Sequence, residues 1–314
     1  MPSYFELLLL IVPVFALIAL GSGARLAGWL TTGADASLMK LVVNLLYPAL
    51  IFRAVLGNPA LADARNVFWP PLVGFGTMAG GIVASLWIGR WLGYSRGLGL
   101  RTFAFAVGIY NYGYIPIPLM QELWGQDSIG VLLVHNVGCE AAVWTVGVLV
   151  VSGVSLRQGW RKLISGPLIA LMLAAAGNVV GLDQVMPEVA DRVLAATGAC
   201  AIPMGLILIG ATLTEYLSKP SQLFSKHVTL AACALRLGVF PVIILGLAKV
   251  LPISVELKQV MVVHAAMPAG IVPILIAKHY GGQPLTAVQV VLGTTAVGVL
   301  VIPLWLKLGM GWVL

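Results

Sequence analysis

Polar and helix-breaking residues interrupt two apolar stretches of the sequence. The first reads NYGYIPIPLM (111–120), and the second reads HAAMPAGIVP (264–273). Proline removes a backbone N–H donor and clashes with the preceding helical turn, so both stretches are expected to break a helix. The N–H groups left free at the start of the next helix carry partial positive charge, which favours a small anion. The residues expected to bind it are Asn111, Tyr112, Gly113, Pro116, His264, Met267, Pro268, Gly270 and Pro273, with Asn44 from an earlier apolar stretch.

Each of these features also has a structural explanation. A proline in a membrane helix often only kinks it, with no ligand involved. The Asn111 amide could hydrogen-bond a substrate carboxylate, or it could cap the helix that follows. His264 could meet the anion or carry a proton, or it could be a neutral side chain bonded to a neighbouring carbonyl. The sequence leaves these alternatives open.

The composition excludes a water-soluble fold. Of 314 residues, 60% are apolar and 9% are charged, against roughly 25% charged in an ordinary soluble domain, and the mean hydropathy is +1.01. The net charge of +7 comes from basic residues that lie mostly in loops, without the interleaved aromatics of a nucleic-acid site. No HExxH, GxSxG, P-loop or GxGxxG motif occurs, and the histidines are scattered. We therefore expect a membrane protein with no catalytic residues, no metal, no cofactor and no nucleic-acid partner.

Apolar runs and turn signals predict an all-α polytopic membrane protein with ten transmembrane helices. A crossing helix needs about 20 apolar residues. The first run, 4–20, lacks a basic n-region and a cleavage site, so it is interpreted as a retained span and not a signal peptide. The expected spans are 4–24, 36–56, 67–89, 100–124, 128–152, 164–181, 192–213, 227–250, 257–280 and 286–308. Basic residues concentrate in the loops after odd-numbered spans, so both termini are expected outside.

A shift of half the chain length relates the two interrupted stretches. It places Gly113 on Gly270 and Pro116 on Pro273. Two five-helix repeats, 1–157 and 158–314, are therefore expected. Because five is an odd number, the repeats must enter the membrane from opposite sides, which is a transporter architecture. Helices four and nine are predicted to be broken and to cross near the middle of the membrane, where irregular backbone lines a cavity instead of facing lipid.

Ionisable side chains inside apolar spans are costly and are therefore functional candidates. Span five contains His135, Asn136 and Glu140, of which Asn136 and Glu140 share a helix face, and span eight contains Arg236. Pairing Arg236 with Glu140 would neutralise both charges. Alternatively, Glu140 is a proton-coupling carboxylate. These four residues are grouped as coupling or buried polar residues.

The sequence resembles the auxin efflux carrier family, which includes plant PIN proteins and bacterial malonate-type permeases. The resemblance rests on the ten-span plan, on NLLYPALIF in span two, on GIYNYGYIPIPLMQELWG in span four and on HAAMPAGIVPILIAKHYG in span nine. It implies an elevator-type carrier of small organic anions in which spans 1, 2, 6 and 7 form a scaffold and spans 3–5 and 8–10 form a moving transport unit. The short connection near 152–163 is similar to that of compact bacterial members, which implies the bacterial inner membrane.

The predicted function is secondary transport of a small mono- or dicarboxylate, malonate- or auxin-like, by alternating access. One alternative is a sodium-coupled carrier similar to the bile acid symporters, which share the ten-span plan. Another is a non-transporting membrane sensor or binding protein, and an intramembrane enzyme is the weakest. A coupling proton or sodium ion and a homodimer are left open as partners, as are the identity of the carboxylate and the direction of net transport.

Overall fold

A computed structural model describes residues 2–94, 97–152, 165–217 and 225–314. Within these ranges the chain is helical, and its β-structure is a single isolated bridge between two residues. The expected boundary between the half-chains at 157/158, and the expected short connection except for Ser152, lie outside the described residues.

Seven helical runs in the described part of the chain are long and apolar enough to cross a membrane. Four of them consist of consecutive segments, of which one pair is separated by a turn at Cys200 and three pairs by π-helical turns. They are α1 (Tyr4–Leu26), α2 (Thr32–Leu41) with α3 (Tyr47–Val55), α4 (Arg65–Trp91), α7 (Gln126–Ala142) with α8 (Val148–Ser152), α12 (Glu188–Ala199) with α13 (Ala201–Leu217), α15 (Lys226–Cys233) with α16 (Phe240–Val250), and α19 (Pro284–Val313). The π turns are Val42–Leu46, Val143–Gly147 and Ala234–Val239. Expected and observed limits of these seven spans differ by a few residues, which supports a multi-pass membrane protein.

The remaining helices are shorter. An apolar helix, α10 (Gly166–Val179), is followed by the short α11 (Leu182–Val185), and a 3-10 turn, Pro59–Ala62, precedes α4.

Both predicted interruptions are present. The first separates α5 (Leu98–Gly108) from α6 (Pro116–Trp124), and the second separates α17 (Val255–Ala266) from α18 (Val272–His279). Helical structure resumes at Pro116 and Val272, inside the two stretches that were expected to break a helix. Pro116 and Pro273 lie in the first turns of their helices, where a missing N–H breaks no helical hydrogen bond. The alternative considered from sequence, that the prolines only kink continuous helices, is therefore wrong here.

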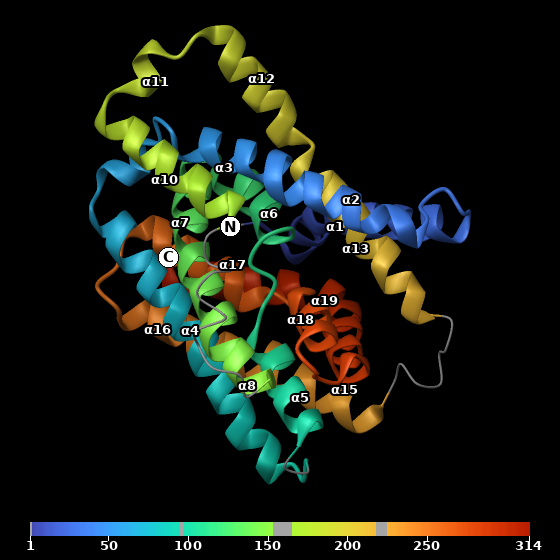
Figure 1. Cartoon of the computed structure of the whole chain (residues 1–314). Helices are drawn as coiled ribbons and strands as arrows, with labels where there is room; N and C mark the ends of the chain where they lie inside the picture. The colour runs from blue at the N-terminus through green and yellow to red at the C-terminus, as the bar shows by residue number, and fades with distance from the viewer. Residues whose placement is uncertain (1, 95–96, 153–164, 218–224) are drawn as a thin grey trace.

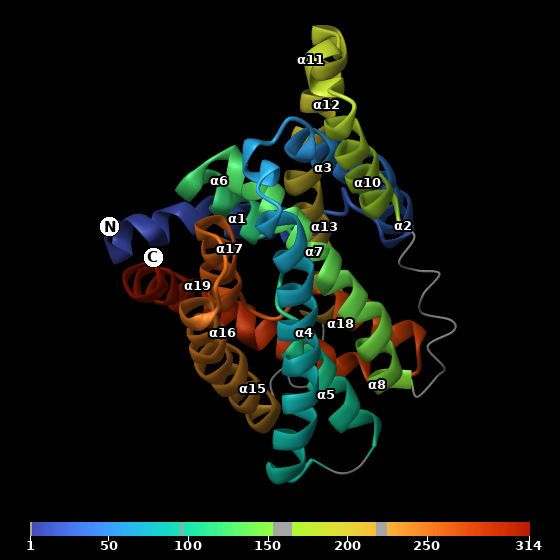
Figure 2. The same ribbon diagram turned by 90° about the vertical axis from the view of Figure 1, so that its left-hand side faces the viewer.

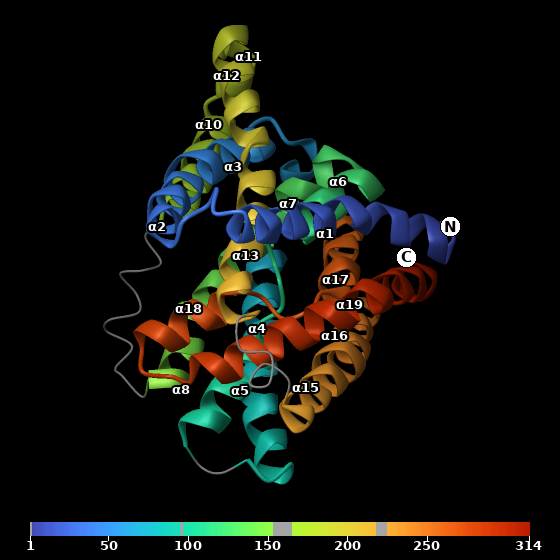
Figure 3. The same ribbon diagram turned by 90° about the vertical axis from the view of Figure 1, so that its right-hand side faces the viewer.

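The helices pack in two groups, which Figures 1 to 3 show from three sides. The first group contains α1, α2, α3, α10, α12 and α13, and the second contains α4 to α8 and α15 to α19. Ion pairs join helices of the first group: Arg25 contacts Asp35 at 2.5 Å and Glu215 at 3.5 Å, and Arg53 contacts Asp191 at 3.0 Å. The groups meet where α1 packs on α19 and where α3 packs on α7.

Glycine permits a close helix contact in each group. A Cβ atom at Gly138 of α7 would lie 1.9 Å from the backbone oxygen of Pro71 in α4. A Cβ atom at Gly210 of α13 would lie 1.9 Å from the backbone oxygen of Ile18 in α1. Because neither backbone can move without shifting a whole helix, the small side chain sets both helix separations. Packing through small residues replaces the hydrophobic driving force that is absent within a membrane.

Gly138→Ala should therefore destabilise the protein by about 1–3 kcal/mol, the usual cost of overpacking a close contact. Thermal unfolding in detergent measures this as a lower melting temperature. The control is Gly246→Ala in α16, where a Cβ atom would meet nothing within 4 Å. It should be neutral or slightly stabilising, because alanine favours helix more than glycine does. Equal melting temperatures for the two variants would contradict the close packing of α4 on α7.

Candidate functional site

The two interrupted segments pair with each other. Tyr110 and Ala269 form an antiparallel bridge. The Asn111 N–H donates to the Pro268 carbonyl at 2.8 Å, and the Gly270 N–H donates to the Ile109 carbonyl at 2.9 Å. The Ala269 N–H donates to the Thr294 hydroxyl of α19 at 3.1 Å. Backbone groups that leave the helical pattern here are thus satisfied inside the protein, as a membrane interior requires.

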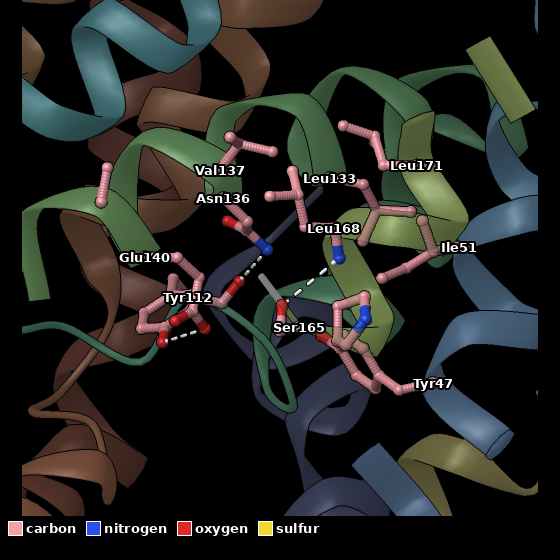
Figure 4. Close-up of a pocket in the computed structure, with 12 residues that line it drawn as sticks. Tyr47, Ile51, Tyr112, Leu133, Asn136, Val137, Glu140, Ser165, Leu168 and Leu171 are labelled. Carbon is pink, nitrogen blue, oxygen red and sulfur yellow. Dashed lines mark hydrogen bonds between the residues drawn. The ribbon is translucent and has the colours of Figure 1, made fainter. Parts of the chain in front are cut away.

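A cavity of about 160 Å³ lies between the two helix groups, beside the segment that links α5 to α6 (Figure 4). Apolar side chains form most of its wall, and polar groups come mainly from α7 and from the linking segment. The lining residues are Tyr47, Ile51, Tyr112, Leu133, Asn136, Val137, Glu140, Ala141, Ser165, Pro167, Leu168 and Leu171.

The polar wall of the cavity is a hydrogen-bonded chain. Glu140 Oε1 accepts a hydrogen bond from the Tyr112 hydroxyl at 2.7 Å, and its Oε2 accepts one from Trp144 Nε1 at 2.8 Å. Asn136 Nδ2 donates to the Tyr112 backbone carbonyl at 2.7 Å, so α7 holds the linking segment at two points. Asn136 Oδ1 is buried and has no hydrogen-bond partner in the described structure.

Comparison with known proteins identifies the family of this chain. The family model described as membrane transport protein matches residues 7–158 and 148–306, nearly the whole chain. The chain belongs to the auxin efflux carrier family. It is also 23% identical over 301 residues to a protein of Methanothermobacter thermautotrophicus described as an uncharacterized transporter, an alignment that covers 94% of this chain and 96% of the relative. Family and relative are both transporters, so the resemblance noted from the motifs is confirmed.

Only part of the residue set predicted from sequence lines the cavity of this carrier-family protein. Tyr112, Asn136 and Glu140 do. Seven other residues expected to bind the anion lie instead at the crossing or in the first turns of α6 and α18. They are Asn111, Gly113, Pro116, Met267, Pro268, Gly270 and Pro273. Asn44 is exposed, and its side chain donates to the Lys40 carbonyl of its own helix at 2.9 Å.

Sequence reasoning missed the wall that α3 and α10 contribute, including Tyr47, Ser165 and Leu168. Tyr47 had a local signal, because it stands in the NLLYPALIF motif beside Pro48. Its hydroxyl lies close to the linking segment, since a Cβ atom at Gly113 would be 2.9 Å from it. Ser165 and Leu168 had no comparable signal, because their position opposite Glu140 depends on how α10 packs.

The predicted ion pair between Arg236 and Glu140 does not form. Arg236 is 1% exposed, and its guanidinium carbon lies 5.2 Å from the Tyr110 ring centroid and 5.5 Å from that of Phe240. Its Nη2 donates a long hydrogen bond of 3.5 Å to the Ala265 carbonyl. Aromatic faces and a carbonyl therefore stabilise the cation in place of a carboxylate.

The two histidines predicted to be functional, His135 and His264, pack near the crossing and do not line the cavity. His135 and His264 are each 1% exposed, and their ring centroids are 4.7 Å apart. His264 also packs on Tyr110, with 5.0 Å between centroids. Both ring nitrogens of His264 are buried and have no hydrogen-bond partner of ordinary length in the described structure.

Asn111 has a local structural role. Its Oδ1 accepts a hydrogen bond of 3.3 Å from the Gly113 N–H, which closes a turn. The residue that precedes α6 is Ile115, and no side chain caps that helix, so the predicted capping by Asn111 is wrong. Its side chain instead stabilises the turn that places Tyr112 in the cavity wall.

Asn111→Ala should lower the free energy of unfolding by about 1 kcal/mol, the scale of one intramolecular hydrogen bond. Asn111→Asp should retain the turn, because an aspartate oxygen accepts the same hydrogen bond. Thermal unfolding of the two purified variants measures the difference. An Asp variant as unstable as the Ala variant would show that the Oδ1 contact does not stabilise the turn.

Proposed function

We propose that this protein is a secondary transporter that carries small organic anions across the membrane by elevator-type alternating access. The observation that carries the proposal is the position of the cavity. Tyr112, Asn136 and Glu140 belong to one helix group, whereas Tyr47, Ile51 and Leu168 belong to the other. A guest bound to the polar wall would therefore travel with that group when the two groups slide past each other.

The two helix groups match the scaffold and the moving transport unit of an elevator-type carrier. We assign α1, α2, α3, α10, α12 and α13 to the scaffold, and α4 to α8 with α15 to α19 to the transport unit. The crossing of the linked half-helices lies wholly within the second group, where its pairing supports a rigid unit. Rigid-body motion of one helix bundle against the other is the usual form of alternating access.

Equal spacing of the helices supports the two proposed inverted repeats, 1–157 and 158–314. α5 begins at Leu98 and α17 at Val255, which is 157 positions later. The same shift places α4 on 222–248, where α15 and α16 run from Lys226 to Val250, and places α7 and α8 on 283–309, where α19 runs from Pro284 to Val313. The proposal counts ten crossings, made of the seven long helices, the short α10 and the two interrupted pairs.

A cavity-filling substitution tests the transport site. Leu168→Trp places an indole in the cavity and should reduce counterflow of a radiolabelled carboxylate in proteoliposomes at least tenfold. The control is Leu173→Trp on the same helix, where the side chain is 58% exposed on the outer surface. It should transport at the rate of the unsubstituted protein. Normal counterflow by the Leu168→Trp variant would show that the substrate path does not pass through this cavity.

Both termini are proposed to face the outside of a bacterial inner membrane. They lie close together in all three views, and the Tyr4 hydroxyl donates to the Leu300 carbonyl at 2.9 Å, so they share one side. The excess of basic residues in the opposite loops supports that side being external.

Cysteines introduced at Ser3 and Leu314, in a variant whose three native cysteines are replaced, test this orientation. Both should react with a membrane-impermeant thiol reagent added to intact cells or spheroplasts. A cysteine introduced at Arg90, in the exposed last turn of α4 on the side proposed to be internal, should react only after the cells are permeabilised. Protection of both terminal positions, with Arg90 labelled in intact cells, would reverse the topology.

A further inference from the structure

A groove between α4 and α16 lies apart from the cavity beside Glu140. Its volume is about 220 Å³, and the two helices that form its walls lie side by side in Figure 2. The groove and the cavity share no lining residue among those described. Ile243 and Leu247 line the groove and are 49% and 38% exposed, and apolar surface of this kind on a membrane helix contacts lipid tails. The groove therefore opens toward the acyl chains of the bilayer.

Arg236 is the charged residue among the described residues that line the groove. It is 1% exposed, and its Nε is buried without a hydrogen-bond partner in the described structure. Its Nη2 lies 3.5 Å from the Ala265 carbonyl, beyond the about 2.7–3.2 Å of an ordinary N–H···O bond. The rings of Tyr110 and Phe240 attract the charge, but they leave Nε unpaired. Because a guanidinium keeps its proton in proteins, Arg236 presents a cation with a free donor to this groove.

No Asp or Glu side chain of the protein neutralises Arg236. The sequence contains eleven Asp and Glu residues, and all of them lie in the described ranges, because the undescribed segments contain no acid. None of these acids forms an ion pair with Arg236. A buried charge without a counter-ion is strongly unfavourable, above all inside a membrane. The site therefore requires an anion that does not belong to the chain.

The α4 wall of the groove is a row of small residues with no helix packed on it. Gly76, Gly80 and Ala84 are spaced four residues apart and therefore share one helix face. A Cβ atom at Gly76 or at Gly80 would meet nothing within 4 Å in the described structure. Rows of this kind usually admit a neighbouring membrane helix at close range. Here the row borders open space, which a hydrocarbon chain from the bilayer can fill.

The depth of Arg236 in the membrane restricts the anion that can reach it. Its transmembrane run is Lys226–Val250, so it lies about 15 Å from one end and about 21 Å from the other at a rise of about 1.5 Å per residue. The hydrocarbon core of a bilayer is about 30 Å thick, so a phospholipid headgroup at the interface does not reach this depth. A free carboxylic acid does, because its head group is small and its neutral form enters hydrocarbon.

We propose that this groove binds a long-chain fatty acid from the bilayer, with its carboxylate on Arg236 and its acyl chain against the small-residue row of α4. The two oxygens of a carboxylate match the parallel donors of a guanidinium, and Nε is one of them. The acid enters from lipid in its neutral form and is bound as the carboxylate, and its proton passes to water, so no bond to carbon changes. The inference does not rest on the transport function proposed above, because it requires only a protein in a membrane.

Two other occupants fit the groove less well. A helix of a second copy, packed on the small-residue row, would cover Arg236 with apolar side chains and leave its charge without a counter-ion. A water-soluble anion would neutralise Arg236, but it would have to cross hydrocarbon to reach the site and would leave the apolar wall unfilled. A fatty acid satisfies both the charge and the apolar wall.

Oleate is the probe for this site. Binding of radiolabelled oleate to the purified full chain in detergent, measured by scintillation proximity, should include a saturable component of one molecule per chain. Methyl oleate, which has the same chain without the charge, should compete at least tenfold more weakly. Acetate and inorganic phosphate, which have the charge without the chain, should not displace oleate at equal concentration.

Two variants test the charge and the space separately. Arg236→Gln should weaken oleate binding at least tenfold, whereas Arg101→Gln, which removes an exposed cation of α5, should not change it. Gly80→Phe keeps Arg236 but fills the groove, and it should also weaken binding at least tenfold. Its matched control is Gly246→Phe in α16, where a Cβ atom likewise meets nothing within 4 Å but which does not line the groove. The Gly80 pair tests the proposal even where Arg236→Gln fails to fold.

Several results would overturn the proposal. The absence of saturable oleate binding, equal binding of oleate and methyl oleate, or full binding by the Gly80→Phe variant would each exclude a fatty acid in this groove. Displacement of oleate by acetate or phosphate would assign Arg236 to a water-soluble anion. Loss of the oleate component in Leu168→Trp, which fills the other cavity, would assign the fatty acid to that cavity. None of these results bears on carboxylate counterflow, so the transport proposal stands or fails separately.

Discussion

The structure depends on satisfying backbone groups where two helices stop inside an apolar protein. A membrane interior offers no water to an unpaired N–H or C=O group, and each such group costs several kcal/mol. Here the interrupted segments satisfy each other through the Tyr110–Ala269 bridge and its two flanking hydrogen bonds. This mutual pairing explains why the breaks occur together. A single break would leave its backbone groups unpaired, whereas two breaks that meet form a small antiparallel contact.

The contact between the two interrupted segments determines which side chains meet on either side of it. On one side it presents Tyr112 to Glu140 and Asn136, so the cavity receives a polar wall from a segment that is not helical. On the other side it places Tyr110 against His264 and within reach of the Arg236 guanidinium. The half-buried acid and the buried base are therefore stabilised separately, one by neutral donors and the other by aromatic rings.

Close packing makes the surrounding groups rigid enough to keep this geometry. Gly138 lets α7 approach α4, and α7 supports both Asn136 and Glu140. In the other group, Gly210 lets α13 approach α1, while ion pairs of Arg25 and Arg53 join helices near their ends. The cavity lies at the boundary between the two groups. A relative movement of the groups would therefore change access to the cavity without disturbing the crossing.

The sequence by itself determined the membrane class, the approximate limits of the long helices and the two breaks. Apolar length and proline position act locally, so hydropathy and the NYGYIPIPLM stretch were enough to predict them. It also identified Tyr112, Asn136 and Glu140 as polar residues in an apolar setting. The tertiary structure alone decided which of these groups meet. Glu140 and Arg236 were each isolated charges in sequence, and pairing them was the simplest neutralisation, yet packing gave them different partners. Tyr47 and Ser165 joined the site because α3 and α10 pack opposite α7, and such contacts between distant segments depend on three-dimensional shape, which local spacing does not encode.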